Sequence, residues 1–430
     1  MVPKRYFFHA SGFDPYDAGA HYRRFARELA RFAAIWNIDA QTSAMRGSGI
    51  ADCHADCHWT VTARAPGWRV VTSFELLDWS DIVRGELGRP SGRRLWEGLA
   101  TFTDLVGSGT AWRYFKANWR YGIFFLVPFL SVLVFAIIAM LTAGYVGTTV
   151  SAAFTSTLWG FVAAVAAAPL MFAALMQWPG ERWRVRQALA DWIFARNYML
   201  GQHPDIEARI EAFAARVVAC ARRADVDEIV VAGHSLGATM AVDLLARAFD
   251  RDPALGQYGA KLCLLTIGAT IPKLALHPRG AWLRHKVQRL AAEPALTWAE
   301  FQARDDVISF HKFDPVKLTR LDNRPAPYPS PLAGEGKVGV GGPVIRRVQI
   351  HQMLNPPALR RFRFNYMRLH YQFVMANERR APYDYFMLVC GPAPFRRTVM
   401  QPNGPDDLYG ADGAYVAGDS LRDAAASYPL

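Results

Sequence analysis

Residues 228–238, EIVVAGHSLGA, contain the pattern that decides the fold of this 430-residue chain. The apolar run at 229–232 predicts a buried strand, and Gly237 begins a stretch with helical spacing of Ala and Leu. Between them lies G-x-S-x-G, with Ser235 at its centre. A sharp strand-to-helix turn of this kind lifts the serine hydroxyl clear of the sheet, and the helix N-terminus and the amide of Leu236 favour a developing oxyanion. The segment predicts a nucleophilic serine, against the alternative of an ordinary turn with a buried serine.

Candidate strands and helices alternate on both sides of this segment. The candidate strands are Tyr6–His9, Trp59–Ala63, Trp68–Phe74, Glu228–Ala232, Leu262–Ile267, Thr297–Ala303 and Val344–Met353. Helical periodicity covers Ala20–Trp36, Gln187–Arg222 with a break at Gly201–Pro204, Gly237–Phe249 and Asn365–Asn377. The alternation predicts an α/β fold with a mostly parallel sheet and helices on both faces.

Composition excludes several classes of protein. With 52% hydrophobic and 20% charged residues, the chain is not wholly disordered. Five cysteines in 430 residues argue against a disulfide scaffold. The net charge of +12 does not follow a stripe that would suit nucleic acid, so no nucleic-acid partner is expected.

A stretch of 60 residues, from Tyr121 to Gly180, contains no charged residue and no histidine. This length suits two membrane spans, placed at Ile123–Thr142 and Leu158–Trp178, with a turn at Ala143–Thr157. Basic residues flank both ends and none lies in the turn, which predicts that both flanks and both termini are cytoplasmic. A pair of buried core helices is the alternative. The basic flanks also fit an anionic leaflet and make membrane lipids the expected partners; they are Arg113, Lys116, Arg120, Arg182, Arg184 and Arg186.

In its strand–turn–helix setting, the segment Gly233–Gly237 resembles the nucleophile elbow of the α/β-hydrolase superfamily, particularly of its lipase-like and esterase-like members. The resemblance covers most of Pro3–Pro392, with the apolar hairpin as an insertion. The chain is also similar to bacterial membrane-associated hydrolases with a G-[YF]-D-P turn, present here at Gly12–Pro15. The resemblance implies a Ser-His-Asp triad in the chain order nucleophile, acid, histidine, an inner-membrane location and no cofactor.

The acid of such a triad is expected directly after Thr297–Ala303, where Asp305 and Asp306 are adjacent. Both are kept, with Asp306 slightly favoured, and Asp314 is a lesser candidate. A carboxylate here would hold the tautomer of the histidine.

The histidine is expected after the last strand. His370 follows that strand at a suitable distance and is the predicted general base; His311 and His351 are the fallbacks. The predicted oxyanion donors are the amides of Leu236 and Phe13, because Gly12 would let the backbone approach the substrate closely.

Domain limits follow from these assignments. Residues 1–110 and 187–392 are expected to form the hydrolase domain, 111–186 the membrane hairpin, 324–343 a flexible insertion and 393–430 a disordered tail. Cys53–His58 is expected to be a surface loop rather than a metal site, since its ligands are crowded into six residues.

The predicted function is cleavage of a carboxylic ester or thioester, with a lipid or acyl-chain substrate suggested by the hairpin. A catalytically inactive, membrane-tethered binding or assembly module is the alternative.

Overall fold

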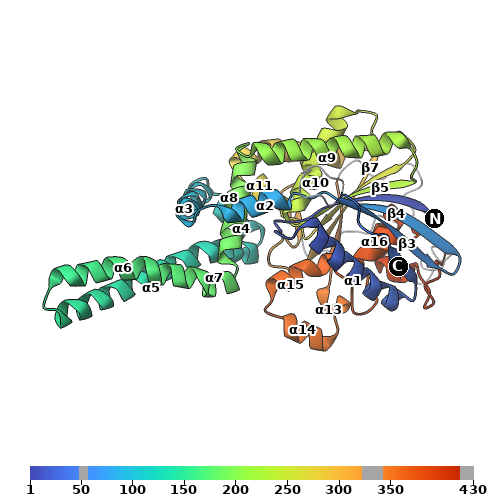
Figure 1. Ribbon diagram of the computed structural model, residues 1–430. Coiled ribbons are helices and arrows are strands. Elements are labelled where there is room, and N and C mark those ends of the chain that lie inside the picture. Colours follow the sequence, from blue (N-terminus) through green and yellow to red (C-terminus); the bar gives the residue numbers. More distant parts are fainter. Residues whose placement is uncertain (48–56, 322–341, 417–430) are drawn as a thin grey trace. The chain divides into compact units, whose positions relative to one another are not determined.

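The computed structural model describes residues 1–47, 57–321 and 342–416 (Figure 1). The chain divides into two compact units: Met1–Val83 with the residues from Pro204 onward, and Arg84–His203. The second unit is therefore larger than the predicted insertion at 111–186, because helices on both sides of the hairpin pack with it.

The first unit is built on an eight-stranded mixed sheet in the order β10-β7-β6-β5-β1-β4-β3-β2. Strands β10, β7, β6, β5, β1 and β4 pair in parallel, and β2 and β3 continue the sheet in antiparallel fashion. The prediction of an α/β fold with a mostly parallel sheet is confirmed. The strands are β1 (Lys4–Ala10), β2 (Asp39–Thr42), β3 (Cys57–Ala65), β4 (Trp68–Leu76), β5 (Glu228–His234), β6 (Lys261–Ile267), β7 (Leu296–Ala303) and β10 (Val344–Val348), with a separate hairpin of β8 (Phe313–Asp314) and β9 (Thr319–Arg320).

Helices cover both faces of this sheet (Figure 1). One face carries α9 (Pro204–Arg223), α10 (Leu236–Arg251) and α12 (Ala281–Ala292), and the other carries α1 (Ala18–Trp36) and α16 (Tyr385–Cys390). Helix α1 begins where Asp17 accepts a hydrogen bond from the amide of Ala20 at 2.7 Å, and it ends at Asn37 in the left-handed conformation. Strand β5 is buried along its whole length, as a central parallel strand requires.

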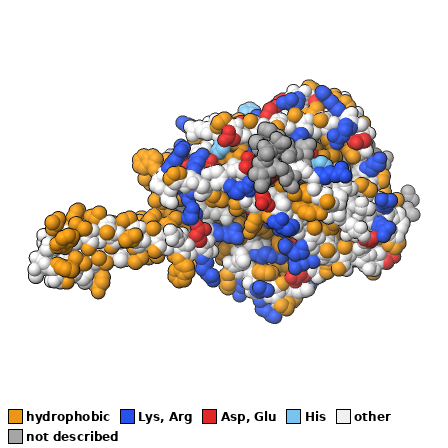
Figure 2. Space-filling model, viewed as in Figure 1, with side chains coloured by type: hydrophobic (Ala, Val, Ile, Leu, Met, Phe, Trp, Pro, Cys, Tyr) orange, Lys and Arg blue, Asp and Glu red, His pale blue; other side chains and the backbone are white. Residues whose placement is uncertain are grey.

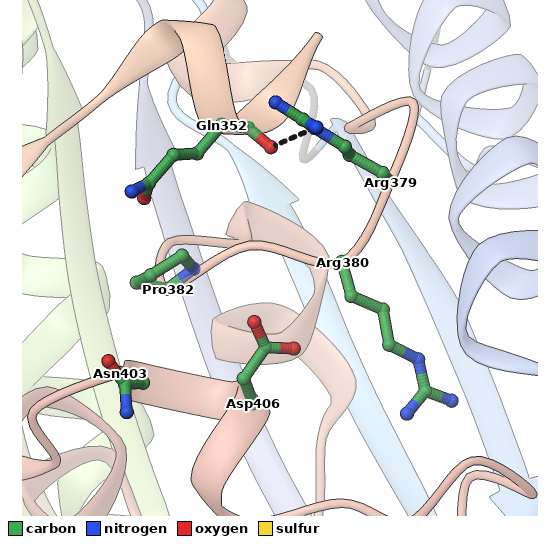
Figure 3. A pocket seen from close by; sticks show the side chains of 6 residues that line it. All are labelled: Gln352, Arg379, Arg380, Pro382, Asn403 and Asp406. Carbon is green, nitrogen blue, oxygen red and sulfur yellow. Dashed lines mark hydrogen bonds between the residues drawn. The ribbon is translucent and has the colours of Figure 1, made fainter. Parts of the chain in front are cut away.

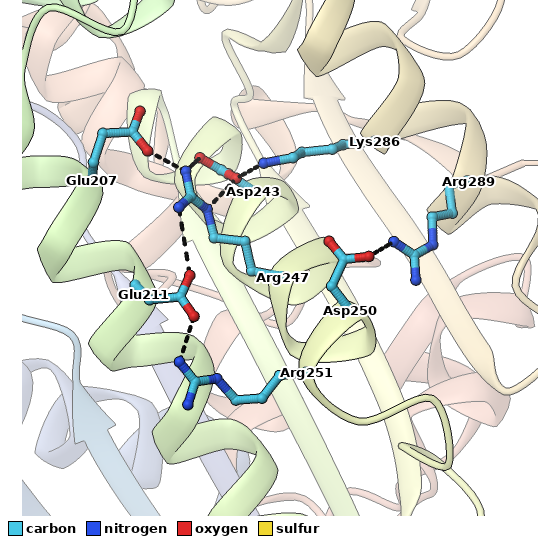
Figure 4. A network of polar contacts seen from close by, with 8 residues as sticks. All are labelled: Glu207, Glu211, Asp243, Arg247, Asp250, Arg251, Lys286 and Arg289. Carbon is cyan, nitrogen blue, oxygen red and sulfur yellow. Dashed lines mark hydrogen bonds and ion pairs between the residues drawn. The ribbon is translucent and has the colours of Figure 1, made fainter.

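An ion-pair network fixes α10 against α9 and α12 (Figure 4). Asp243 of α10 is fully buried, and its carboxylate accepts a hydrogen bond from Arg247 Nε at 2.9 Å and an ion pair from Lys286. Arg247 also pairs with Glu207 of α9. Burial alone would raise the pKa of Asp243, but the two cations outweigh it and hold that pKa below its usual range. The network immobilises the helix that follows Ser235.

The C-terminal part differs from expectation in three places. The predicted strand at 344–353 ends at Val348 and is followed by helix α13 (Ile350–Met353). The predicted helix at 365–377 is divided into α15 (Tyr366–Tyr371) and a 3-10 turn, Gln372–Val374. Ala393–Val416 is folded rather than a disordered tail, because α17 (Phe395–Met400) and the following 3-10 turn, Gly404–Asp407, bury apolar side chains; these include Phe395, Val399, Leu408 and Tyr409. The predicted insertion at 324–343 lies outside the described residues except at its last two positions, and so does the tail beyond 416.

The second unit consists of helices. Two of them are long and apolar enough to cross a membrane: α5 (Trp119–Ala153) and α6 (Thr157–Gln177). At 1.5 Å per residue α5 measures about 52 Å and α6 about 31 Å. The length of α6 equals the thickness of a hydrocarbon core of about 30 Å, and α5 is longer than that thickness. The remaining helices are α3 (Ser91–Gly107), α4 (Thr110–Ala117), α7 (Pro179–Arg182) and α8 (Val185–Met199), and α2 (Ser80–Gly88) crosses the boundary between the units.

The apolar hairpin turns later than predicted. Most of the expected turn at 143–157 continues α5, since the Thr148 and Thr149 hydroxyls donate to the carbonyl of Tyr145 at 2.9 and 3.0 Å and are satisfied inside the helix. The two helices pack closely where a Cβ on Gly160 would lie 2.6 Å from the carbonyl oxygen of Gly147. Figure 2 shows the hairpin covered by hydrophobic side chains, with charged side chains only at its base.

Candidate active site

Ser235 occupies a strained turn between β5 and α10. Its φ of 58° and ψ of −124° belong to a region that non-glycine residues rarely adopt, at a cost of about 1–3 kcal/mol. Every residue from Glu228 to Ala246 is buried except Ser235, which is partly exposed. A Cβ on Gly233 or on Gly237 would overlap neighbouring backbone. The small flanking residues of the pattern are therefore required by packing.

The turn after β1 packs directly on this serine. A Cβ on Gly12 would lie 2.9 Å from Ser235 Cβ and 3.4 Å from Ser235 Oγ. The hydrogen atoms of Gly237 face the carbonyls of Ala10 and Ser11, which a side chain there would overlap. Gly12, next to Phe13, thus packs on Ser235, and Leu236 follows the serine as the first residue of α10, so both segments predicted to carry the amide donors adjoin Ser235.

His370 and Asp306 form a buried pair at the carboxyl edge of the sheet. His370 Nδ1 lies 2.8 Å from Asp306 Oδ2, and both side chains are at most 3% exposed. Because an ionised carboxylate only accepts hydrogen bonds, Nδ1 carries the proton and Nε2 is left as the basic nitrogen. Asp306 Oδ1 accepts the amide of Ile308 at 3.0 Å, which fixes the carboxylate. A Cβ on Gly268, after β6, would lie 3.1 Å from Asp306 Oδ2, so this glycine makes room for the pair.

The ring of His370 lies beside the elbow. Its centroid is 4.4 Å from that of His234, whose Nε2–H donates to the carbonyl oxygen of His370 at 3.1 Å. Burial, together with the neighbouring His370, lowers the pKa of His234 well below its usual value, so His234 is neutral. His370 Nε2 is buried and has no hydrogen-bond partner among the described residues. The hydroxyl of Ser235 is thus not bonded to it in this state, and such bonds often close only around a substrate.

A polar contact joins the turn after β1 to the histidine segment. Asp14, 1% exposed, accepts the Tyr371 hydroxyl at 2.8 Å through Oδ2 and the Tyr16 amide at 3.1 Å through Oδ1. Arg24 lies 3.6 Å from Oδ2 and 5.2 Å from the centroid of the Tyr371 ring. Neither Asp14 nor Tyr371 was predicted to be a site residue, although Asp14 is adjacent to Phe13 and Tyr371 to His370. This hydrogen bond fixes the turn after β1 relative to Tyr371, the residue that follows His370.

The remaining sequence candidates lie elsewhere or in other roles. Asp305 is partly exposed, and it is Asp306 that bonds His370. Asp314 Oδ1 accepts the amides of Val316 and Lys317 in its own turn. His351 is exposed on α13. Most of Cys53–His58 lies outside the described residues, and the described residues contain no cluster of metal-ligating side chains.

A separate polar cavity of about 430 Å³ lies in the C-terminal part (Figure 3). Its two arginines are bonded to backbone: Arg379 Nε donates to the carbonyl of Gln352 at 2.8 Å, and Arg380 Nη1 donates to that of Gly410 at 2.7 Å. Arg380 also stacks on Trp36 with its guanidinium carbon 4.6 Å from the ring centroid. Arg379 thus holds its segment to α13 and Arg380 holds it to the chain after α16, and none of the six lining residues belongs to the serine site.

Of the predicted residues, the structure pairs His370 with Asp306, places His370 beside His234, the neighbour of Ser235, and packs Gly12, the neighbour of Phe13, on Ser235. A partly exposed hydroxyl, a buried imidazole and a buried carboxylate bonded to it are the components of nucleophilic acyl transfer. Comparisons with models of protein families, with curated proteins and with solved structures find no match to this chain.

Proposed function

We propose that the chain is a membrane-anchored serine hydrolase with an α/β-hydrolase type of fold, which cleaves a carboxylic ester or thioester through an acyl-enzyme. The observation that carries this proposal is the placement of a strained, partly exposed serine beside a buried His–Asp pair at the carboxyl edge of parallel strands. An ordinary βα turn would gain nothing from the backbone strain at Ser235. It would also gain nothing from a buried His370 Nε2 that has no hydrogen-bond partner among the described residues.

The mechanism begins when His370 Nε2 removes the proton from Ser235 Oγ as Oγ attacks the carbonyl carbon. Asp306 stabilises the imidazolium that forms, through the 2.8 Å bond to Nδ1. The amides of Leu236 and Phe13 stabilise the oxyanion, each contributing about 3–4 kcal/mol to the transition state. His370 then protonates the leaving alcohol or thiol, and water releases the acyl group by the same steps.

Membrane anchoring is supported by α5 and α6 and by the basic residues at their ends. By the positive-inside bias, the proposed orientation has both flanks, both termini and the catalytic unit in the cytoplasm. The membrane proposed is a bacterial inner membrane. The tryptophans of the flanks are largely exposed, as interfacial anchors are; they are Trp112, Trp119, Trp178 and Trp183. An anchored enzyme would meet lipid or acyl-chain esters at the membrane surface.

Labelling with a fluorophosphonate probe tests the enzyme proposal on the full chain in membranes. The native chain and Ser73→Ala, which changes a half-buried serine in β4, should label equally, whereas Ser235→Ala should not label at all. Absence of label from the native chain as well would favour the alternative of an inactive, membrane-tethered binding or assembly module. Label retained in Ser235→Ala would assign the nucleophile to another residue.

Product analysis then separates hydrolysis from acyl transfer. The native chain is expected to release the free acid from p-nitrophenyl esters of several acyl-chain lengths, and to do so without an added alcohol. A requirement for an alcohol acceptor would identify an acyltransferase on the same scaffold.

A further inference from the structure

Helix α3 presents an uncharged outer face that nothing in the described chain covers. Three large apolar side chains on it, Trp96, Leu99 and Val106, are 72, 56 and 47% exposed. With the helical repeat of 3.6 residues they fall on one side together with the smaller exposed residues of the face, which are Ala100, Thr103 and Gly107. The buried residues Arg94, Gly98, Thr101 and Leu105 occupy the opposite side.

The position of α3 along the hairpin sets the depth of this outer face. Phe102, on one flank of α3, contacts Phe125 and Phe129 of α5 with ring centroids 6.1 and 5.1 Å apart. Both partners lie in the uncharged run, within its first turns. The buried side of α3 packs against α8, where a Cβ on Gly98 would lie 2.9 Å from Leu189 Cδ1. Helix α3 is therefore fixed beside the end of the hairpin at which the apolar surface begins.

Charges around α3 suit an anionic surface. The two acids that border the outer face are already paired: Glu97 with Arg89 and Arg93 at 3.1 and 2.8 Å, and Asp104 with Arg196 at 2.7 Å. Residues 84–203 contain eleven Lys and Arg against five Asp and Glu. A basic helical unit with an uncharged, tryptophan-containing face is typical of helices that lie in the plane of an anionic membrane.

We propose that α3 is an interfacial helix, whose outer face inserts into the boundary between headgroups and acyl chains of an anionic leaflet, beside the two spans. This inference rests on the membrane anchoring in the proposed function, and not on the catalytic activity. It makes the lipid surface the partner of α3 and gives the protein a third membrane contact. By analogy with helices of this kind, the outer face lies about 5–10 Å deep.

The test uses the full chain in vesicles of phosphatidylethanolamine and phosphatidylglycerol, with an environment-sensitive fluorophore on a single introduced cysteine. Leu99→Cys and Val106→Cys report on the outer face, Leu133→Cys on the hairpin, and Ser91→Cys on an exposed position of α3 off that face. Cys53→Ser is the background, because the four described cysteines are buried. Quenchers are doxyl groups attached near the headgroup end or deep in the acyl chain, and aqueous iodide.

The proposal expects blue-shifted emission at positions 99 and 106, with stronger quenching by the shallow doxyl group than by the deep one. Position 133 should show the reverse order, and position 91 should be quenched by iodide. Iodide quenching at 99 and 106, with doxyl quenching kept at 133, would overturn the α3 proposal while leaving the spans intact. Protection of positions 99 and 106 from iodide and from both doxyl groups would also overturn it, since a protein contact would then cover the face. Loss of doxyl quenching at 133 would reject the anchoring itself, whatever the outcome of fluorophosphonate labelling.

Discussion

Replacement of Asp306 by Asn is the substitution that most directly examines the predicted catalytic pair. The carboxamide has nearly the same shape as the carboxylate, and its oxygen can still accept the Ile308 amide at 3.0 Å. Its NH₂ group then faces His370 Nδ1 across the 2.8 Å contact and donates to it. The imidazole is forced into the tautomer with its proton on Nε2, where it cannot accept the proton of Ser235. The expected loss is about 10⁴-fold in kcat, or about 5 kcal/mol of transition-state stabilisation.

The assay compares kcat for p-nitrophenyl ester hydrolysis in the native chain, Asp306→Asn and Asp305→Asn. Asp305→Asn is a matched control, since it removes the same charge from the adjacent, partly exposed position. It should retain activity within about threefold, because the side chain of Asp305 does not bond His370. The assignment is refuted if Asp306→Asn keeps more than a tenth of native activity, or if the loss follows Asp305→Asn instead.

Three further substitutions give different readouts. Gly237→Ala should lower the free energy of unfolding by about 1–3 kcal/mol in urea titrations and abolish fluorophosphonate labelling, since its Cβ would overlap the carbonyl of Ser11; native-like labelling would contradict the packing described. Tyr371→Phe should reduce kcat about tenfold with KM little changed, because Asp14 loses the 2.8 Å hydrogen bond that fixes the turn after β1, where Phe13 is the proposed oxyanion donor. An effect on KM alone would argue against this positioning role. Burial raises the pKa of Glu300 to about 7, above its usual 4.5. Between these pH values Glu300 is ionised in the unfolded chain but protonated in the folded one, so the free energy of unfolding falls as pH rises, by about 3 kcal/mol in total. Glu300→Gln should flatten that decline in urea titrations at several pH values, and an unchanged slope would contradict it.

The elements that the sequence predicts well are those whose signals are local. The apolar run before Ser235 is strand β5, and the glycines on either side of the serine are required by contacts within the same turn. The order of strands and helices from β5 to β7 placed an acid directly after β7, where Asp306 lies. The choice between Asp305 and Asp306 could not be made from the sequence, because it depends on which of two neighbours faces the interior.

Features that depend on distant contacts were missed. The bond between Asp14 and Tyr371 joins residues 357 positions apart, and no local pattern indicates it. The packing of Phe395 and Val399 against the core gives order to a polar, glycine-rich stretch that composition alone predicts to be disordered. No element was predicted at 91–107, where the structure has helix α3.

The central position of β1 has a consequence for synthesis of the protein. Strand β1 pairs with β4 on one side, but its other neighbour, β5, begins about 150 residues after β4 ends. At the usual speed of translation, the nascent chain keeps that edge of β1 unpaired for on the order of ten seconds, while both apolar helices leave the ribosome. An apolar strand with an open edge is a template for aggregation. The residues inserted between β4 and β5 therefore delay closure of the sheet and leave this edge of β1 open to aggregation during synthesis.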